Sequence, residues 1–257
     1  MKNEFDKNYA KLNARQREAV DTIEGPVMVV AGPGTGKTQI LAMRIANILK
    51  KTQINPSNIL CLTFTNSGVQ AMKQRLLAII GPASYQIHVH TFHSFCNEII
   101  NSYPEKFLTA KKINQLTDLE QIQEIQKVLK SNNYNQIKPF KAPFHYQKSI
   151  ISAIGKLKQE NISPLDFKEI IEKQALSFRD IEDLYHTKGA YKGKMKSVYV
   201  ELETNIKRNK ELADIYEKYQ RNLTENGKYD YADMILFVLD AFQKDNNILS
   251  YYQEKYQ

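Results

Sequence analysis

The chain contains few cysteines and no long apolar run. These two features argue against a disulfide-rich protein and against a membrane-spanning one. Its two cysteines, Cys61 and Cys96, lie in apolar surroundings without a C-x-x-C partner, which favours core residues over a disulfide or a metal site. No stretch approaches the roughly 18 to 20 uninterrupted apolar residues of a membrane span. The start, MKNEFDKNYAKLNARQ, lacks the apolar stretch of a secretory signal. We therefore expect a cytoplasmic protein with no membrane partner.

Acidic residues are outnumbered by basic ones. The sequence has 36 Lys and Arg against 28 Asp and Glu, a net charge of +8. This excess suits a polyanionic partner but does not require one. Residues 186–197 read HTKGAYKGKMKS and form a basic loop with two glycines and four lysines, Lys188, Lys192, Lys194 and Lys196. A solvated surface loop and a contact to a sugar-phosphate backbone are both open for this segment.

A Gly-rich loop near the start carries the strongest single motif. Residues 31–38 read AGPGTGKT and match G-x-x-x-x-G-K-[ST], between an apolar run at 26–30 and a helix-like stretch at 39–46. Glycine allows backbone conformations in which successive N–H groups point at a phosphate. Lys37 offers a mobile charge to the outer phosphates, and the Thr38 hydroxyl is placed to bind Mg²⁺. The motif predicts a phosphate-binding loop; the alternative is a turn that merely joins a strand to a helix.

The pattern of apolar residues predicts an α/β fold with a helical insertion. Short apolar strands at 27–30, 58–64 and 85–89 alternate with helices, which is typical of a parallel sheet with helices on both faces. From about 105 to 225 the strand signal disappears, and helical spacing occurs at 116–130, 146–159, 164–173 and 203–223. Residues 229–257 are again helix-like. We expect one α/β domain from residues 1–104 and 226–257, and an all-α insertion from 105–225.

Three short strings surround the Gly-rich loop in the sequence. They are LNARQREAV at 12–20, TFTN at 63–66 and TFHSF at 91–95. The side-chain amide of Gln16 offers one donor and one acceptor to an adenine edge. His88, His90 and His93 form H-x-H-x-x-H, but the first two share a strand face and His93 begins the next helix, so we do not expect a zinc site.

The order of these strings makes the chain resemble the UvrD/Rep/PcrA family of superfamily 1 DNA helicases. The resemblance spans nearly the whole sequence and includes LNxxQ, AGxGxGKT, TFTNxxxxxMxxR, TFHS, a KxxxISP-like string at 158–164, IYEKYQxxL at 215–223 and DYxDM at 230–234. It implies a RecA-like motor domain, incomplete in this chain, that is split by a helical domain inserted after TFHS.

The resemblance also implies the site residues and the ligands. ATP and Mg²⁺ would be the cofactors, with Lys37 and Thr38 as the catalytic pair and Thr38 as a ligand of Mg²⁺. The nucleotide site would comprise Gln16, Gly32, Pro33, Gly34, Thr35, Gly36, Lys37, Thr38 and Gln39. Single-stranded DNA would contact Thr63, Phe64, Thr65, Asn66, Thr91, Phe92 and His93. Lys192 and Lys194 are added as candidate DNA contacts on their charge. The expected partners are single-stranded DNA, its junction with duplex, and the remainder of a helicase chain.

Phe64 is the expected stacking platform for a base, and a buried core phenylalanine at a strand end is the alternative. Two positions depart from the family pattern. Gln39 stands where many members have an arginine that can stack on the base, and Ser67 stands where a lysine is common. Neither change affects the Gly-rich loop itself.

One further absence concerns hydrolysis. Phosphoryl transfer to water needs an acid that anchors Mg²⁺ and a second carboxylate, normally at the end of an apolar strand as D-E. Asp240 follows an apolar run, but Ala241 comes next and the helical spacing continues, so Asp240 is predicted to be a helix residue. By resemblance, the strand bearing DExQD would follow Gln257. A sheet without it is expected to be less stable or to recruit another chain.

We therefore expect the amino-terminal part of a helicase that translocates 3′ to 5′, the direction being implied by resemblance alone. By itself this part is expected to bind Mg·ATP and DNA without hydrolysing ATP. The alternative is a non-catalytic DNA- or protein-binding regulatory module. A different P-loop enzyme, such as a kinase, would leave TFTN and TFHS unexplained.

Overall fold

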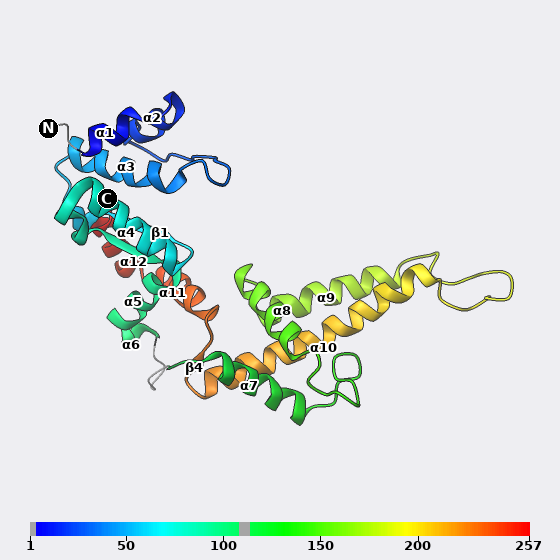
Figure 1. Ribbon diagram of the computed structural model, residues 1–257. Coiled ribbons are helices and arrows are strands. Elements are labelled where there is room, and N and C mark those ends of the chain that lie inside the picture. Colours follow the sequence, from blue (N-terminus) through cyan, green and yellow to red (C-terminus); the bar gives the residue numbers. More distant parts are fainter. Residues whose placement is uncertain (1–3, 108–113) are drawn as a thin grey trace. The chain divides into compact units, whose positions relative to one another are not determined.

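The computed structural model describes residues 4–107 and 114–257, which form two compact units (Figure 1). The first unit comprises residues up to 102 together with 238–257, and the second comprises residues 103–237. Helices dominate both, and each of the two described sheets has two parallel strands. The protein is therefore a mixed α/β protein with small parallel sheets.

Two parallel strands form the sheet of the first unit. β1 (Leu60–Thr63) pairs with β2 (His88–Thr91), with Leu60 opposite His88 and Thr63 opposite Thr91. The helices of this unit are α1 (Glu4–Ala10), α2 (Ala14–Asp21), α3 (Lys37–Lys51), α4 (Asn66–Ile80), α5 (Phe92–Ser102) and α12 (Asn246–Lys255), with short 3-10 turns η1 (Pro56–Asn58) and η2 (Gly81–Gln86). The helix α11 (Asp233–Lys244) begins in the second unit and ends in the first.

The core of the first unit lies between the sheet and its helices. Val20, Met43 and Leu76, from α2, α3 and α4, are fully buried there, and Val89 of β2 is nearly so. Cys61 and Cys96 are buried free thiols, as predicted. Burial raises the pKa of both thiols to about 11, so neither is a reactive thiolate at neutral pH.

The predicted strand at 27–30 is wrong. No strand occurs at these residues, and Met28 and Val30 are each 88% exposed. Isolated strands are not stable, because their backbone N–H and C=O groups need a neighbouring strand. Within the described ranges β1 pairs with β2 alone, and no strand borders residues 26–30. The predicted strand at 85–89 is shifted, because residues 81–86 form the turn η2 and β2 begins at His88.

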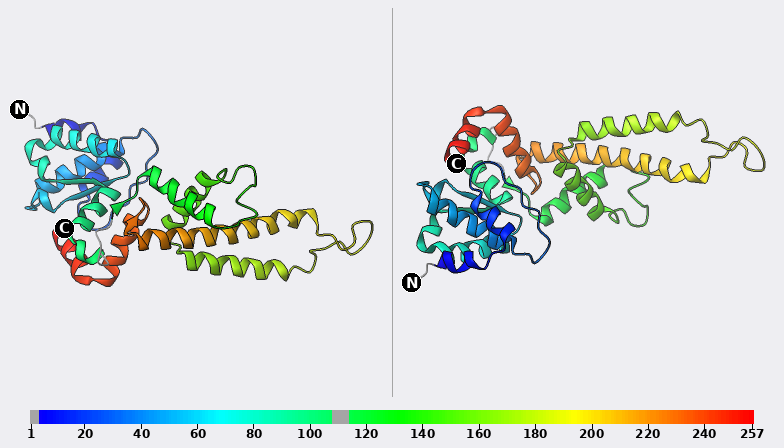
Figure 2. Two further views of the ribbon diagram at one scale, coloured as in Figure 1. Left: turned by 90° about the horizontal axis from the view of Figure 1, so that it is seen from below. Right: turned by 90° about the horizontal axis from the view of Figure 1, so that it is seen from above.

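Helices form most of the second unit, as the apolar spacing predicted. They are α6 (Pro104–Phe107), α7 (Asp118–Ser131), α8 (Gln147–Gln159), α9 (Pro164–Arg179) and α10 (Ser197–Glu225). Thr117 and Ser163 form capping boxes with Glu120 and Asp166, which explains where α7 and α9 begin. α9 and α10 lie side by side and pack Ile171 and Phe178 against Ile206 and Ala213 (Figure 2).

One short strand lies in the region predicted to be purely helical, and it pairs with a second short strand just beyond that region. β3 (Asn114–Gln115) pairs in parallel with β4 (Lys228–Tyr229). The pairing lies within the second unit, which extends to residue 237, whereas the insertion is expected from the sequence to end at 225. A two-residue strand has no detectable alternation, which is why the sequence pattern gave no sign of it.

Asp240 lies inside α11 and forms an ion pair with Lys244 at 2.8 Å, which confirms the prediction of a helix residue. In residues 4–107 and 114–257, no helix has both the length and the apolar character needed to cross a membrane.

Candidate functional site

The Gly-rich loop leads directly into α3. Gly34 and Gly36 have φ angles of 74° and 87°, a left-handed conformation that side chains disfavour. Gly36 is the N-cap of α3, and no side chain caps the helix. No atom lies within 4 Å of where a Cβ would stand at either glycine. The space beside these two glycines is thus open, and a Gly-rich loop that leads into a helix N-terminus fits a phosphate group.

Lys37 folds back over this loop. Its Nζ donates to the carbonyl oxygens of Ala31 at 3.0 Å and Gly32 at 2.7 Å. The Thr35 hydroxyl donates to the same Gly32 oxygen at 2.8 Å. The ammonium group is therefore held at the loop by two neutral carbonyls, which an anion can replace as partners.

Gln16 lies beside the loop with both ends of its amide engaged. Its Oε1 accepts from the Asn13 backbone N–H at 3.0 Å in a capping box, and its Nε2 donates to the Thr35 carbonyl at 3.3 Å. Asn47 on α3 donates to the Val20 carbonyl at 2.9 Å and holds α2 in place. An adenine edge could use the Gln16 amide only after these contacts are broken.

The other residues of the predicted nucleotide site lie in the Gly-rich loop and in the first turn of α3. Thr38 is half-buried in the first turn of α3, and Pro33 is exposed in the loop. Gln39 Nε2 donates to Asn8 Oδ1 on α1 at 3.5 Å. Across the described residues there is no group of three or more His, Cys, Asp or Glu side chains placed to hold a metal ion.

The carboxyl ends of β1 and β2 bring two aromatic rings together. Phe64 is 88% exposed, Phe92 is 38% exposed, and their ring centroids are 5.2 Å apart. The alternative that Phe64 is a buried core residue is therefore wrong. The pair presents an aromatic surface where two parallel strands end, which is where α/β proteins place their binding sites.

The polar residues of TFTN and TFHS cap helices. Thr65 Oγ1 accepts from the Gly68 backbone N–H at 3.0 Å at the start of α4, beside exposed Asn66. Thr63 Oγ1 donates to the Thr65 carbonyl at 3.0 Å. Thr91 and Ser94 exchange hydrogen bonds at the start of α5, with 2.8 Å from the Thr91 backbone N–H to Ser94 Oγ. These caps fix the backbone that carries Phe64 and Phe92.

The three histidines do not converge on a common point that could hold a metal ion. The rings of His88 and His90 stack 6.0 Å apart on one face of β2, and His90 Nε2 lies 3.5 Å from Glu98 Oε2. Burial lowers the pKa of His93 and, together with Lys255, that of His88, so these two imidazoles are neutral at pH 7.

The basic loop belongs to the second unit and is closed by backbone hydrogen bonds. His186 donates to the Lys194 carbonyl at 3.0 Å, and Gly193 donates to the His186 carbonyl at 2.8 Å. Lys194 Nζ lies over the ring of Tyr191, which is 63% exposed, and Lys196 forms an ion pair with Asp183. For Lys188 and Lys192 the described structure gives no ion pair. The loop is thus a compact turn with exposed lysines.

A buried ion cluster in the second unit was missed. Lys158 Nζ lies 2.7 Å from Asp230 Oδ2 and 2.7 Å from Asp233 Oδ1, and all three side chains are at most 4% exposed. The Tyr219 hydroxyl donates to Asp230 at 2.9 Å. The sequence shows both strings, at 158–164 and at 230–234. Lys158 stands at a position of its helix where an apolar residue would be expected, and only the acids of DYxDM could have suggested a partner for it.

These features agree with the comparison with known proteins. A family model described as UvrD/REP helicase N-terminal domain matches residues 12–257. The chain therefore belongs to the UvrD/REP helicase N-terminal domain family, and the resemblance inferred from its motifs is confirmed.

Its relatives include helicases from several bacteria. The ATP-dependent DNA helicase PcrA of Staphylococcus aureus (strain Mu50) is 30% identical over 246 residues, which cover 96% of this chain and 28% of the relative. PcrA of Bacillus subtilis (strain 168) is 30% identical and PcrA of Staphylococcus epidermidis 31% identical, with the same coverage. The chain thus spans less than a third of the length of the curated relatives it matches.

Proposed function

We propose that this chain is the amino-terminal part of an ATP-dependent DNA helicase and translocase. The first unit would form a RecA-like motor domain, and the second unit would be the helical domain inserted into it. One observation carries the proposal: the Gly-rich loop opens α3 with left-handed Gly34 and Gly36, in a chain that matches the UvrD/REP family over residues 12–257.

The Gly-rich loop is the proposed site of Mg·ATP, whose hydrolysis would supply the free energy for movement on DNA. In this proposal the first amides of α3 bind the phosphates, and Lys37 exchanges the Ala31 and Gly32 carbonyls for phosphate oxygens. Thr38 is the proposed Mg²⁺ ligand. Gln16 would release the Thr35 carbonyl to reach the adenine edge.

Single-stranded DNA is the proposed ligand of the aromatic pair. Phe64 and Phe92 offer faces on which bases of any type can stack, and the capped ends of α4 and α5 offer polar groups beside them. Thr63, Thr65, Asn66 and His93 are the other proposed DNA contacts, and Thr91, which is buried, would act by holding the TFHS backbone through Ser94. Unpaired Lys192 and ring-stacked Lys194 are the proposed backbone contacts of the second unit.

Nucleotide binding is tested with a fluorescent ATP analogue and Mg²⁺. The chain is expected to bind it, and Lys37→Ala is expected to weaken binding by about tenfold or more, because a charge-assisted contact to phosphate is lost. Lys73→Ala, an exposed lysine on α4, is the matched control. Equal affinity of the Lys37→Ala and Lys73→Ala variants would contradict the proposed site.

The chain by itself is proposed to be silent in hydrolysis. None of the four described strands carries an acidic residue, so none presents carboxylates for Mg²⁺ and water. Phosphate release is expected to stay at background with or without oligo-dT. Release that disappears in Lys37→Ala would overturn this part of the proposal.

A second candidate function, a non-catalytic DNA-binding module, is favoured by the basic loop alone. Its exposed lysines and Tyr191 suit a duplex backbone, and such binding weakens steeply with salt. If it holds, replacing Lys192 and Lys194 by Gln should weaken duplex binding and lower the salt slope by about two. Replacing Lys207 and Lys210 on α10 is the control. No binding to duplex at low salt would exclude the module.

A further inference from the structure

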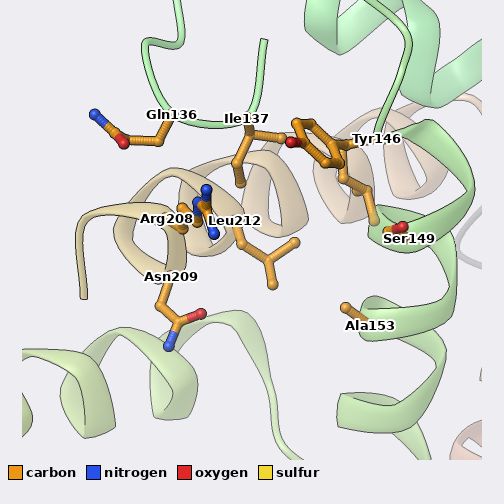
Figure 3. A pocket seen from close by; sticks show the side chains of 9 residues that line it. Gln136, Ile137, Tyr146, Ser149, Ala153, Arg208, Asn209 and Leu212 are labelled. Atoms are coloured by element: carbon orange, nitrogen blue, oxygen red, sulfur yellow. The ribbon is translucent and has the colours of Figure 1, made fainter. Parts of the chain in front are cut away.

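A cavity of about 300 Å³ lies in the second unit between α8, α10 and the loop that precedes α8 (Figure 3). Ile137 from the loop, Ile150 and Ala153 from α8, and Leu212 from α10 form its apolar lining. Its volume is at the lower end of the range of known ligand sites, about 300 to 1,000 Å³. Neither the Gly-rich loop nor the aromatic pair contributes to it.

Polar side chains surround this apolar lining. They are Gln136, Tyr146, Ser149, Arg208 and Asn209. In the part of the chain that the structure describes, none of their side-chain polar atoms takes part in a hydrogen bond or an ion pair. Other basic side chains of α10 do form ion pairs: Lys207 pairs with Glu203 at 2.9 Å, and Lys218 pairs with Asp214 at 2.6 Å. Arg208 thus has no partner for its guanidinium among the described residues.

Hydrogen bonds outside the cavity hold its walls in place. The Glu211 carboxylate accepts from the backbone N–H groups of Asn135 at 2.7 Å, Gln136 at 2.9 Å and Ile137 at 2.9 Å, and it ties the loop to α10. Gln126 Nε2 on α7 donates to Gln147 Oε1 on α8 at 2.9 Å. A site built in advance loses less entropy when a ligand binds.

The chemistry of the cavity selects one kind of occupant. Among the described residues that line it, the one charged group is the Arg208 guanidinium, which matches a carboxylate with two parallel hydrogen bonds. A nucleic acid backbone is normally met by several cations, and a base by flat aromatic faces, whereas this lining is mostly aliphatic. We propose that the cavity binds an apolar side chain of a partner polypeptide, with an acidic residue next to it that pairs with Arg208.

The test uses the full chain with methyl groups labelled for NMR and a synthetic acidic peptide that contains one Phe flanked by Glu. The peptide is expected to shift the methyl signals of Ile137, Ile150 and Leu212 and to leave Ile171, in the separate core between α9 and α10, unchanged. Peptides with Gln in place of Glu, or Ala in place of Phe, are expected to bind at least about tenfold more weakly.

Variants of the chain separate the cavity from general charge effects. Arg208→Gln removes the cation and Ala153→Leu fills the cavity, and each is expected to weaken the peptide about tenfold. Lys210→Gln makes the same charge change on α10 outside the cavity and is expected to have no effect. The exposed position of Arg208 keeps the test informative if Ala153→Leu fails to fold.

Three results would overturn the proposal. The first is that the peptide shifts none of the three cavity methyl signals. The second is that an oligo-dT strand shifts them with a dependence on Arg208, which would make the cavity a nucleic acid site. The third is that dilution of the chain alone shifts them, which would make a second copy the occupant.

Discussion

At the scale of single residues, Phe64 is the clearest case in which the structure adds to a sequence motif, because it shows whether the side chain is exposed. TFTN alone does not say whether its phenylalanine is buried, but an 88% exposed ring 5.2 Å from Phe92 is available to a ligand. Large exposed aromatic rings are costly to leave in water, and their common use is binding. The ring can be removed with little effect on the core.

The change Phe64→Ala tests this residue. It is expected to weaken oligo-dT binding by about 1 to 3 kcal/mol, the usual loss when one stacked base loses its platform. Fluorescence anisotropy at fixed salt measures the affinity. Tyr85→Ala is the control, because Tyr85 is also strongly exposed, at 77%, but lies in η2. If both variants bind like the unchanged chain, Phe64 is not the platform.

At the scale of elements, the buried ion cluster joins α8 to the segment after α10. Burial of Lys158 costs free energy that only its two carboxylates and their hydrogen bonds can offset. Burial raises the pKa of Asp230, but Lys158, the backbone and Tyr219 outweigh it and hold that pKa below its ordinary value. Burial raises the pKa of Asp233, and together with the smaller effect of the Asp230 charge it outweighs the lowering effect of Lys158.

The two carboxylates therefore stabilise the fold in opposite pH ranges. A lowered pKa gives Asp230 a stabilising effect above the unfolded value of 3.8, which is lost as the pH falls through its folded pKa. A raised pKa gives Asp233 a stabilising effect at low pH, which is lost as the pH rises through its folded pKa.

At pH 7, Asp230→Asn is accordingly expected to lower the free energy of unfolding by about 3 to 5 kcal/mol, as for a broken buried ion pair. Asp233→Asn is expected to lower it by less, and Lys244→Gln on the exposed end of α11 by almost nothing. Urea unfolding followed by circular dichroism gives the three values. The reverse order for the two aspartates would contradict the assignment of their pKa shifts.

Secondary structure was predicted well for helices, because the apolar face of a helix can be recognised from the spacing of its own residues. The helices at 118–131, 147–159 and 164–179 follow from their apolar spacing, and the first and third also begin with capping boxes. A strand depends on a neighbour that its own residues do not encode, so the apolar run at 26–30 was wrongly predicted to be a strand.

Contacts between distant segments also escaped prediction. The partners of Lys158 lie 72 and 75 residues further along the chain, and no periodicity links them. A candidate site can be predicted from the sequence where its motif is continuous, as in residues 31–38. The cavity near Arg208 was not, because its walls come from a loop and two helices that only the fold brings together.

At the scale of the whole molecule, the first unit leaves an apolar segment uncovered. Val27 and Val29 are partly exposed, and Met28 and Val30 are 88% exposed. Contiguous exposed apolar residues favour association, either with other polypeptide segments or between copies.

The chain is therefore expected to self-associate at high concentration. Met28→Lys with Val30→Lys is expected to lower the average mass in sedimentation, because each charge opposes burial of the segment. Leu119→Lys with Leu165→Lys, two exposed leucines of the second unit, is the control pair. A chain that stays monomeric at all concentrations, with or without the lysines, would show that the segment is no association surface.

The separation within the ion cluster has a consequence for synthesis. A ribosome that has completed α8 has released Lys158, but its partner Asp230 is still 72 residues away. Until then a fully buried ammonium group would lack its carboxylates, so the nascent chain must keep Lys158 hydrated. The last turns of α8 can pack only after the acids emerge, and α10 is made before them. The speed of translation between residues 158 and 233 thus sets the time during which the second unit lacks the carboxylates that pair with Lys158.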